Sequence, residues 1–187
     1  MTKIAIFSSH NGSGFEALYE ASIKKELDIE IGVIISNNSA ANVLKKAKNL
    51  DIPNYIVNDK VCDNVENRLV ELLKEYRCEY IFLSGYMKKI SPLITNNYKV
   101  INSHPALLPA YGGAGMYGKY VHEAVVANKE KNSGVTIHEV NENYDEGAII
   151  LQNSLTLDEN ETPESLETKI KALEKITIVQ GFQKCLN

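Results

Sequence analysis

The stretch Val100-Ile101-Asn102-Ser103-His104-Pro105-Ala106-Leu107-Leu108-Pro109 decides the fold. Its apolar start predicts a buried strand over residues 100–103. Asn102 and His104 then project from the same face, because side chains alternate along a strand. Pro105 disfavours helical geometry at His104 and ends the strand. Ligands of open α/β sheets bind outside the carboxyl ends of the strands, so this amide and imidazole form a candidate site.

The segments before this stretch alternate between two patterns. Short apolar runs predict strands over residues 3–7, 29–35, 54–57 and Tyr80–Leu83. Apolar residues at helical spacing predict helices from Phe15 onward and over about 40–50, 61–76 and 92–97. The run Asn37-Asn38-Ser39 is expected to cap the second of these helices. Such alternation is typical of a parallel, doubly wound sheet.

The pattern changes after the stretch. Residues 110–118 are rich in glycine, residues 120–128 predict a short helix, and residues 134–140 and 148–155 predict a pair of strands. Thr162 and Pro163 begin a final helix that runs to about residue 183. We therefore expect one domain over residues 1–187 of the α/β class. It is a Rossmann-like, doubly wound, mostly parallel sheet with a C-terminal strand pair and a long C-terminal helix.

Composition excludes several classes of protein. The 187 residues carry a net charge of -4, which argues against a general nucleic-acid surface. No apolar run approaches the ~20 residues of a membrane span, and residues 4–7 are too short for a signal peptide, so we expect a cytoplasmic protein. The cysteines, Cys62, Cys78 and Cys185, are widely spaced and predict free thiols.

A glycine-rich loop follows the first predicted strand. Its sequence, Gly12-Ser13-Gly14-Phe15-Glu16-Ala17, fits the dinucleotide-binding pattern between a strand and a helix. That pattern also requires an acidic residue at the end of the second strand, where this chain has Asn37, so NAD(P) is disfavoured. Two interpretations stay open: a phosphate site at a helix N-terminus, or a tight turn that merely needs glycine.

The remaining polar residues divide into candidates for catalysis and residues with structural roles. His104 is suited to proton transfer near neutral pH, and Asn102 to hydrogen bonding a developing oxyanion. From spacing alone, Asp145 is best interpreted as a solvated turn residue, and His138 with Thr136 as structural packing. We expect His122 on the surface and His10 as support for the glycine turn. The histidines have no metal-binding spacing, so no metal is expected.

Several ordered blocks resemble the folate-dependent formyltransferases, and within them the enzymes that formylate glycinamide ribonucleotide. The resemblance covers nearly the whole chain. Its blocks are Asn11-Gly12-Ser13, Ser36-Asn37, Leu83-Ser84-Gly85-Tyr86-Met87-Lys88, the Asn102–Pro109 block, Gly134-Val135-Thr136-Ile137-His138, Asp145-Glu146-Gly147, Ile149-Ile150-Leu151-Gln152 and Leu173-Glu174. The Asn-x-His-Pro-x-Leu-Leu-Pro block followed by Asp-x-Gly is its most specific part.

The resemblance implies an activity and a set of roles. The activity is formyl transfer from 10-formyltetrahydrofolate, as co-substrate, to the amine of glycinamide ribonucleotide in purine biosynthesis, without a metal. Asn102, a protonated His104 and Asp145 would be catalytic. Gly12, Ser13 and Gly14 would bind the substrate phosphate, and Glu174 its ribose. The folate pocket would be formed by Tyr86, Met87, Lys88, Lys89, Ile90, Asn141, Glu142, Asn143 and Tyr144.

The sequence departs from the family pattern at two of these places. Gly14 stands where asparagine is usual, and Lys88-Lys89 where arginine and an apolar residue are common. Rival hypotheses are formyl transfer to an amino sugar nucleotide or to methionyl-tRNA, hydrolysis of formyltetrahydrofolate, and a non-catalytic nucleotide- or folate-binding module. The partners expected are small molecules, with no nucleic acid and no membrane, and the protein is expected as a monomer or homodimer.

Overall fold

The computed structural model describes residues 1–186, which fall into two compact units. The first unit is Met1–Asn102. The second is Ser103–Asn187, described here through residue 186. This division does not test whether residues 1–187 form one domain, so the expectation of a single domain stays a prediction.

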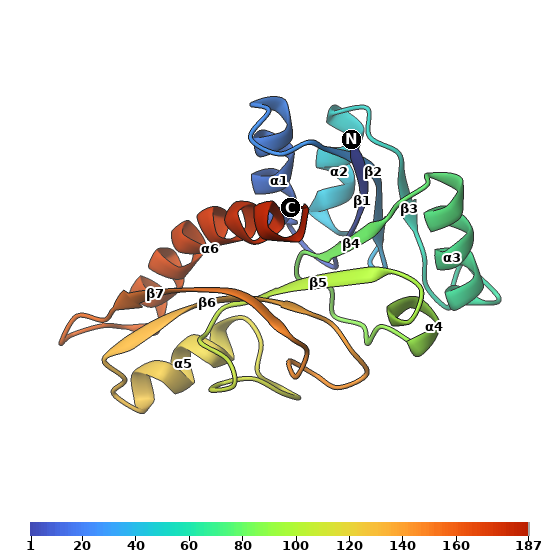
Figure 1. Cartoon of the computed structure of the whole chain (residues 1–187). Helices are drawn as coiled ribbons and strands as arrows, with labels where there is room; N and C mark the ends of the chain where they lie inside the picture. The colour runs from blue at the N-terminus through green and yellow to red at the C-terminus, as the bar shows by residue number, and fades with distance from the viewer. Residues whose placement is uncertain (187) are drawn as a thin grey trace. The chain divides into compact units, whose positions relative to one another are not determined.

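The first unit is a parallel sheet with helices. Its strands run in the order β3-β2-β1-β4-β5, and every adjacent pair is parallel. The strands are β1 (Thr2–Phe7), β2 (Ile29–Ser36), β3 (Asn54–Ile56), β4 (Tyr80–Leu83) and β5 (Lys99–His104), and the helices are α1 (Ser13–Ile23), α2 (Asn42–Asn49), α3 (Val65–Glu75) and α4 (Pro92–Thr95). Figure 1 shows α1 and α2 on one side of these strands and α3 and α4 on the other.

The core of the first unit lies in its central strands. Residues 4–7 of β1 and all of β4 are buried, as are residues 31–36 of β2. Strands covered on both faces read as continuous apolar runs, which is why these segments could be recognised from the sequence. The carboxyl ends of β1 and β4 lie together, because Phe7 pairs with Leu83.

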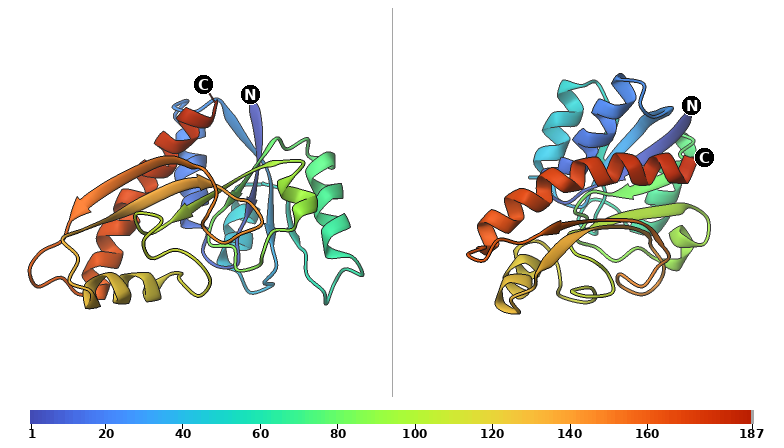
Figure 2. Two further views of the ribbon diagram at one scale, coloured as in Figure 1. Left: turned by 60° about the horizontal axis from the view of Figure 1, so that its bottom comes forward. Right: turned by 60° about the vertical axis from the view of Figure 1, so that its left-hand side comes forward.

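The second unit combines an antiparallel strand pair with two helices. Its elements are α5 (Lys119–Ala127), β6 (Asn132–Glu139), β7 (Ile149–Thr156) and α6 (Pro163–Leu186). Strands β6 and β7 pair from Asn132 with Thr156 to His138 with Ile149. Helix α6 packs along both strands and against α5 (Figure 2). Gly181 permits this approach, since a Cβ there would lie 2.9 Å from the Ile137 side chain.

The expected fold class is confirmed: a mostly parallel α/β sheet, a C-terminal strand pair and a long last helix. The cap expected from Asn37-Asn38-Ser39 is wrong, because Ala41 occupies the N-cap of α2 and makes no side-chain cap. Asn38 instead accepts from the Ala40 N–H within the preceding loop. The last helix is capped as expected, by the Ser165 N–H donating to Thr162 Oγ1 at 3.2 Å.

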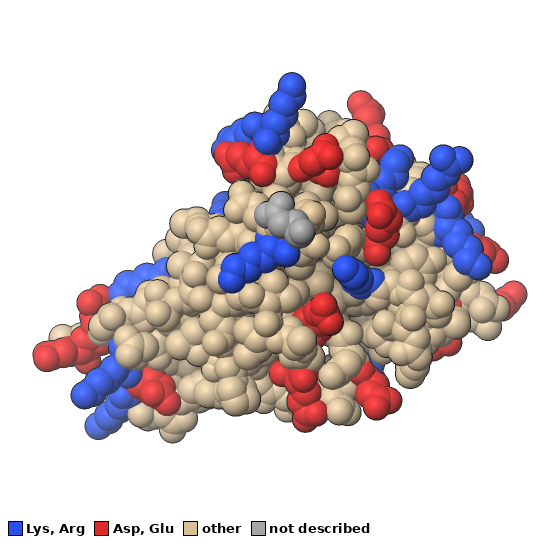
Figure 3. All heavy atoms as spheres, in the orientation of Figure 1, with Lys and Arg blue, Asp and Glu red and all other residues tan. Residues whose placement is uncertain are grey.

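Surface charge is mixed in the part of the chain that the structure describes. On the face shown in Figure 3, Lys and Arg side chains lie among Asp and Glu side chains, without a continuous basic stripe. Among residues 1–186, no helix is both long and apolar enough to cross a membrane.

Candidate functional site

A buried histidine–carboxylate pair lies at the end of β5. His104 is the last residue of that strand, and its Nδ1 lies 3.5 Å from Oδ2 of Asp145. The exposed fractions of the two side chains are 4% and 13%. The interpretation of Asp145 as a solvated turn residue is therefore wrong, because the fold turns its carboxylate inward.

The backbone around Asp145 explains this inward orientation. Asp145 has a φ of +59°, a left-handed conformation that is uncommon outside glycine. Its Oδ2 accepts the Gly113 N–H at 2.9 Å, and Oδ1 lies 3.5 Å from Nε2 of His138. Gly112 leaves room for the carboxylate, since a Cβ there would lie 3.2 Å from Cβ of Asp145. His138 is buried as packing predicts, but it also faces the carboxylate.

Burial and neighbouring groups have opposing effects on the pKa values of His104 and Asp145. Burial lowers the pKa of His104, while Asp145 and the Tyr111 carbonyl oppose that shift only in part. In this balance the burial of the imidazole outweighs the nearby carboxylate. Burial alone would raise the pKa of Asp145. Its contact with His138, the charge of His104 and the Gly113 N–H together hold that pKa below its ordinary value.

Both nitrogens of His104 are occupied. Nε2 lies 2.7 Å from the Tyr111 carbonyl oxygen, which only accepts hydrogen bonds, so Nε2 carries a proton. Nδ1 faces Asp145. A substrate oxyanion could take the place of the Tyr111 carbonyl as the acceptor of this N–H, which gives the imidazole a donor role.

The segment after His104 is held by side chains of β6 and β7. Thr136 Oγ1 donates to the Ala106 carbonyl at 2.7 Å and accepts the Leu108 N–H at 3.0 Å. Gln152 Nε2 donates to the Leu108 carbonyl at 2.9 Å. These bonds satisfy an irregular segment that would otherwise bury unpaired backbone groups.

In the first unit, the glycine loop leads into α1. Gly12 is the N-cap in a left-handed conformation, with φ of +64°, and has no side chain to cap the helix, while Ser84 Oγ accepts the Phe15 N–H of the first turn at 3.3 Å. A Cβ on Gly12 would lie 2.5 Å from Val43 Cγ2, so both the space and the conformation require glycine here. The N-terminus of a helix, preceded by small residues, suits an anion.

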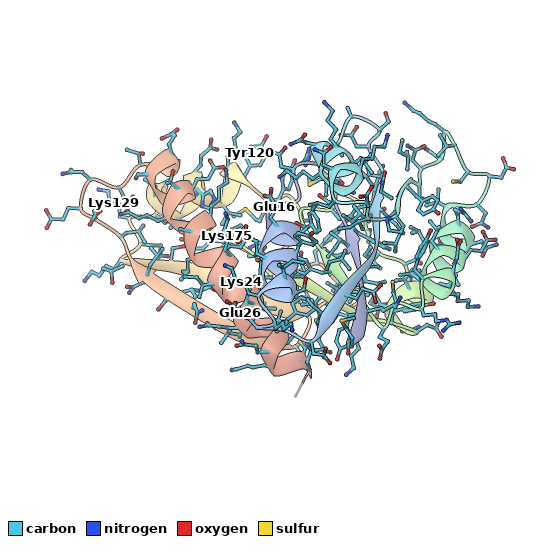
Figure 4. All side chains as sticks on the ribbon, turned by 90° about the horizontal axis from the view of Figure 1, so that it is seen from above. Glu16, Lys24, Glu26, Tyr120, Lys129 and Lys175 are labelled. Carbon is cyan, nitrogen blue, oxygen red and sulfur yellow. The ribbon has the colours of Figure 1, made fainter. Side chains whose placement is uncertain are left out.

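A charged pair, Lys46 and Glu16, lies beside this loop. Lys46 Nζ lies 2.8 Å from Oε1 of Glu16, which Figure 4 shows near the start of α1. The same ammonium donates to the Asn11 carbonyl at 2.9 Å. Lys46 thus ties α2 to the glycine loop, a role that the sequence did not suggest.

Ser9 joins the loops that follow β1, β2 and β4. Its Oγ donates to Oδ1 of Asn37 and accepts the Met87 N–H at 2.8 Å. A dinucleotide-binding fold needs an acidic residue at position 37. Asn37 instead accepts a hydrogen bond from Ser9 and so helps to join these loops. Its bond with Ser9 ties the loop after β2 to the loop after β1, and the Met87 N–H ties in the loop after β4.

The residues expected to bind folate fall in two exposed loops, one in each unit. In the first unit, the Tyr86 ring lies 5.4 Å from that of Phe7, and burial raises the pKa of Tyr86 to about 12. Ile90 is buried, whereas Met87, Lys88 and Lys89 are exposed. In the second unit, Asn141, Glu142, Asn143 and Tyr144 are exposed between β6 and β7.

Glu174, expected to bind ribose, is partly buried on α6. Its Oε1 accepts the Ser103 hydroxyl at 2.6 Å. Burial raises the pKa of Glu174, against opposing contributions from Ser103 and Lys171. Ser103 was not among the expected site residues. Its position between Asn102 and His104 on the opposite face of β5 is the signal that could have identified it.

His122 contradicts its expected surface position. Its exposed fraction is 4%, because it lies on the face of α5 that also carries Val121 and Val125. Nδ1 of His122 is buried without a hydrogen-bond partner. Across residues 1–186, no cluster of three or more His, Cys, Asp or Glu side chains is suited to holding a metal ion.

Comparison with known proteins shows the family to which the chain is similar. A family model described as formyl transferase matches residues 2–181. The chain is 34% identical to a phosphoribosylglycinamide formyltransferase of Bacillus subtilis (strain 168) over 179 residues, which cover 93% of this chain and 89% of that protein. A crystal structure of phosphoribosylglycinamide formyltransferase from Bacillus halodurans matches with a TM-score of 0.89 at 31% identity, covering 100% of this chain and 96% of that one.

The plant relatives are longer than this chain. The chloroplastic phosphoribosylglycinamide formyltransferase of Vigna unguiculata is 36% identical over 174 residues, which cover 90% of this chain. The chain spans 55% of the length of that protein.

Proposed function

Because the chain belongs to the formyl transferase family, we propose that it transfers a formyl group from 10-formyltetrahydrofolate to the amine of glycinamide ribonucleotide. The proposal is supported by the names of the bacterial and plant relatives, which are phosphoribosylglycinamide formyltransferases. The observation that carries it is the buried His104–Asp145 pair, which follows Asn102 at the end of β5.

The reaction assigns a role to each member of the trio. The substrate amine attacks the formyl carbon and forms a C–N bond, which produces a tetrahedral oxyanion. The Asn102 amide and the His104 Nε2–H donate to that oxyanion, and a well-aimed donor of this kind contributes roughly 3–4 kcal/mol. Asp145 orients the imidazole and stabilises its charged form as a proton arrives.

Collapse of the intermediate completes the transfer. The bond between the formyl carbon and N10 of the folate breaks, and N10 takes a proton. The amine loses a proton in the same sequence, so no net proton is consumed. This proton passes through His104 or through a water molecule, and both groups suit transfer near neutral pH.

The binding roles follow the two units. In the first unit, Gly12, Ser13 and Gly14 bind the phosphate of the ribonucleotide through backbone N–H groups, a role supported by the start of α1, where the N-cap Gly12 has no side chain. Tyr86, Met87, Lys88, Lys89 and Ile90 contribute to the folate pocket. In the second unit, Glu174 binds the ribose, and Asn141, Glu142, Asn143 and Tyr144 contribute to the folate pocket. These partners are small molecules, and we propose a cytoplasmic location.

A single assay tests the proposal. The purified protein is incubated with 10-formyltetrahydrofolate, and the absorbance change of folate product formation is followed with glycinamide ribonucleotide, with an amino sugar nucleotide and with water alone. We expect turnover only with the ribonucleotide. No turnover with it would refute the proposal, and turnover with water alone would indicate a hydrolase.

A further inference from the structure

Asp145 lies between two imidazoles rather than beside one. Oδ2 faces Nδ1 of His104 at 3.5 Å, and Oδ1 faces Nε2 of His138 at 3.5 Å. The exposed fractions of the His104, Asp145 and His138 side chains are 4%, 13% and 2%. All three groups lie in the second unit or at its start, so their arrangement is internal to one compact unit.

The opposite nitrogen of each imidazole is bound to a backbone carbonyl. Nε2 of His104 lies 2.7 Å from the Tyr111 oxygen, and Nδ1 of His138 lies 2.8 Å from the Glu139 oxygen. A carbonyl only accepts, so both of these nitrogens carry protons. The nitrogens that face Asp145 therefore carry a proton only when their imidazole is charged.

Charge balance then limits how many protons this His104–Asp145–His138 cluster holds. With both imidazoles neutral, a buried carboxylate would face two lone pairs. With both charged, the buried cluster would carry a net positive charge. Burying unbalanced charge is costly, so one charged imidazole beside one carboxylate is the favoured state.

We propose that His138 is a positioning residue that holds Asp145 toward His104, so that the two imidazoles share one carboxylate. The role of His104 as a catalytic group rests on the proposed function. The assignment of His138 as the residue that positions Asp145 does not, because it follows from contacts within the protein alone.

The contacts of His138 affect both other members of the cluster. Contact with His138 lowers the pKa of Asp145, as the charge of His104 also does. The charge of His138 also lowers the pKa of His104, in the same direction as burial. The titratable groups facing His104 are thus Asp145 and His138, with His122 of α5 coupled to it more weakly.

The test is an NMR titration of the His104 ring in the full chain. The protein has four histidines, so their Cε1–H signals are assigned by single substitutions. His138→Gln removes the imidazole that faces Asp145 but keeps a polar side chain with an N–H donor. We expect the His104 midpoint to rise by about half a pH unit or more, because Asp145 then pairs with His104 alone and the repulsion from His138 is gone.

Two further variants separate positioning from packing. In an Asp145→Asn background, His138→Gln should shift the His104 midpoint much less, because the carboxylate that couples the two rings is absent. His122→Gln, a buried histidine outside the cluster, serves as the matched control and should shift it less than His138→Gln. Circular dichroism confirms folding, and His138→Asn replaces His138→Gln if the latter fails to fold.

The outcomes are distinct. An unchanged His104 midpoint in folded His138→Gln, or an equal shift without Asp145, would overturn the inference. In activity assays, the acidic midpoint of kcat/KM should rise together with the His104 titration. If the wild type transfers no formyl group while the NMR shift appears, the proposed function fails and the assignment of His138 stands.

Discussion

Nδ1 of His104 lies 3.5 Å from Oδ2 of Asp145, although His104 ends a strand and Asp145 lies in the loop between β6 and β7. Three features support this proximity: the Gly113 N–H on the carboxylate, the missing side chain of Gly112, and the left-handed backbone at Asp145. A strained backbone persists only where its surroundings fix it. The loop is therefore built to hold one carboxylate between His104 and His138.

Replacing Asp145 by asparagine should remove most of the transfer activity. The variant keeps the size of the side chain but loses the charge that raises the pKa of His104. We expect kcat to fall by roughly 10²-fold or more, the usual loss for a disturbed acid–base group. Steady-state kinetics check this, with the unfolding midpoint as the control. A folded variant with the wild-type kcat would contradict the assigned role.

Gly12→Ala should weaken both the fold and the binding of the ribonucleotide. The new Cβ meets Val43 at 2.5 Å, and φ is +64°, so we expect a loss of about 2 kcal/mol or more in the free energy of unfolding. KM for the ribonucleotide should rise more than KM for the folate, because the loop is assigned to the phosphate. Urea unfolding and steady-state kinetics measure the two effects.

Gly85→Ala provides the control for a positive φ without a steric contact. Gly85 has φ of +67°, close to that of Gly12, but a Cβ there meets nothing within 4 Å. This variant should lose about 1 kcal/mol, less than Gly12→Ala. Equal losses in the two variants would show that contact with Val43 contributes little.

The parallel half of the fold could be predicted because its signals are local. The buried strands are continuous apolar runs, and β4 spans the predicted residues, Tyr80–Leu83. The start of α6 was likewise encoded by its Thr-Pro pair. The N-terminus of α2 was not, because Asn38 forms local bonds that compete with capping.

The geometry of the candidate site could be predicted only in part. Asn102 and His104 share a strand, so alternation places them together. Asp145 and His138 reach His104 only through tertiary packing, which sequence spacing does not encode. The burial of His122 could have been predicted from the sequence, however, because residues 121, 122 and 125 lie on one face of the helix. The expected surface position followed from the neighbouring Glu123 rather than from this stripe, and it is wrong.

Thr136→Val should destabilise the segment that follows His104. Valine fills the same space but leaves the Leu108 N–H and the Ala106 carbonyl without their side-chain partner. A buried unpaired group costs about 1–3 kcal/mol, and we expect a loss of this size in urea unfolding. Thr136→Ser, which retains the hydroxyl, should recover part of it. The exposed Thr168→Val serves as the control, and an equal loss there would refute the explanation.

His122→Leu should reduce the pH dependence of stability. Burial and, more weakly, Lys171 lower the pKa of His122, against the opposing charge of Glu167. The unfolded chain titrates near the ordinary value of about 6.5. As the pH falls below that value, the unfolded state binds a proton that the folded state excludes, so the free energy of unfolding decreases until the folded pKa is reached. His104 contributes in the same direction.

The leucine variant removes the His122 share of this effect. The free energy of unfolding, measured in urea at pH 7.5, 6.5 and 5.5 (values chosen to bracket about 6.5), should therefore fall less steeply than in the wild type. His10→Gln is the matched control, because His10 is exposed, and it should keep the wild-type slope. The same slope in His122→Leu and the wild type would mean that His122 is charged in the folded state, which its burial without an Nδ1 partner opposes.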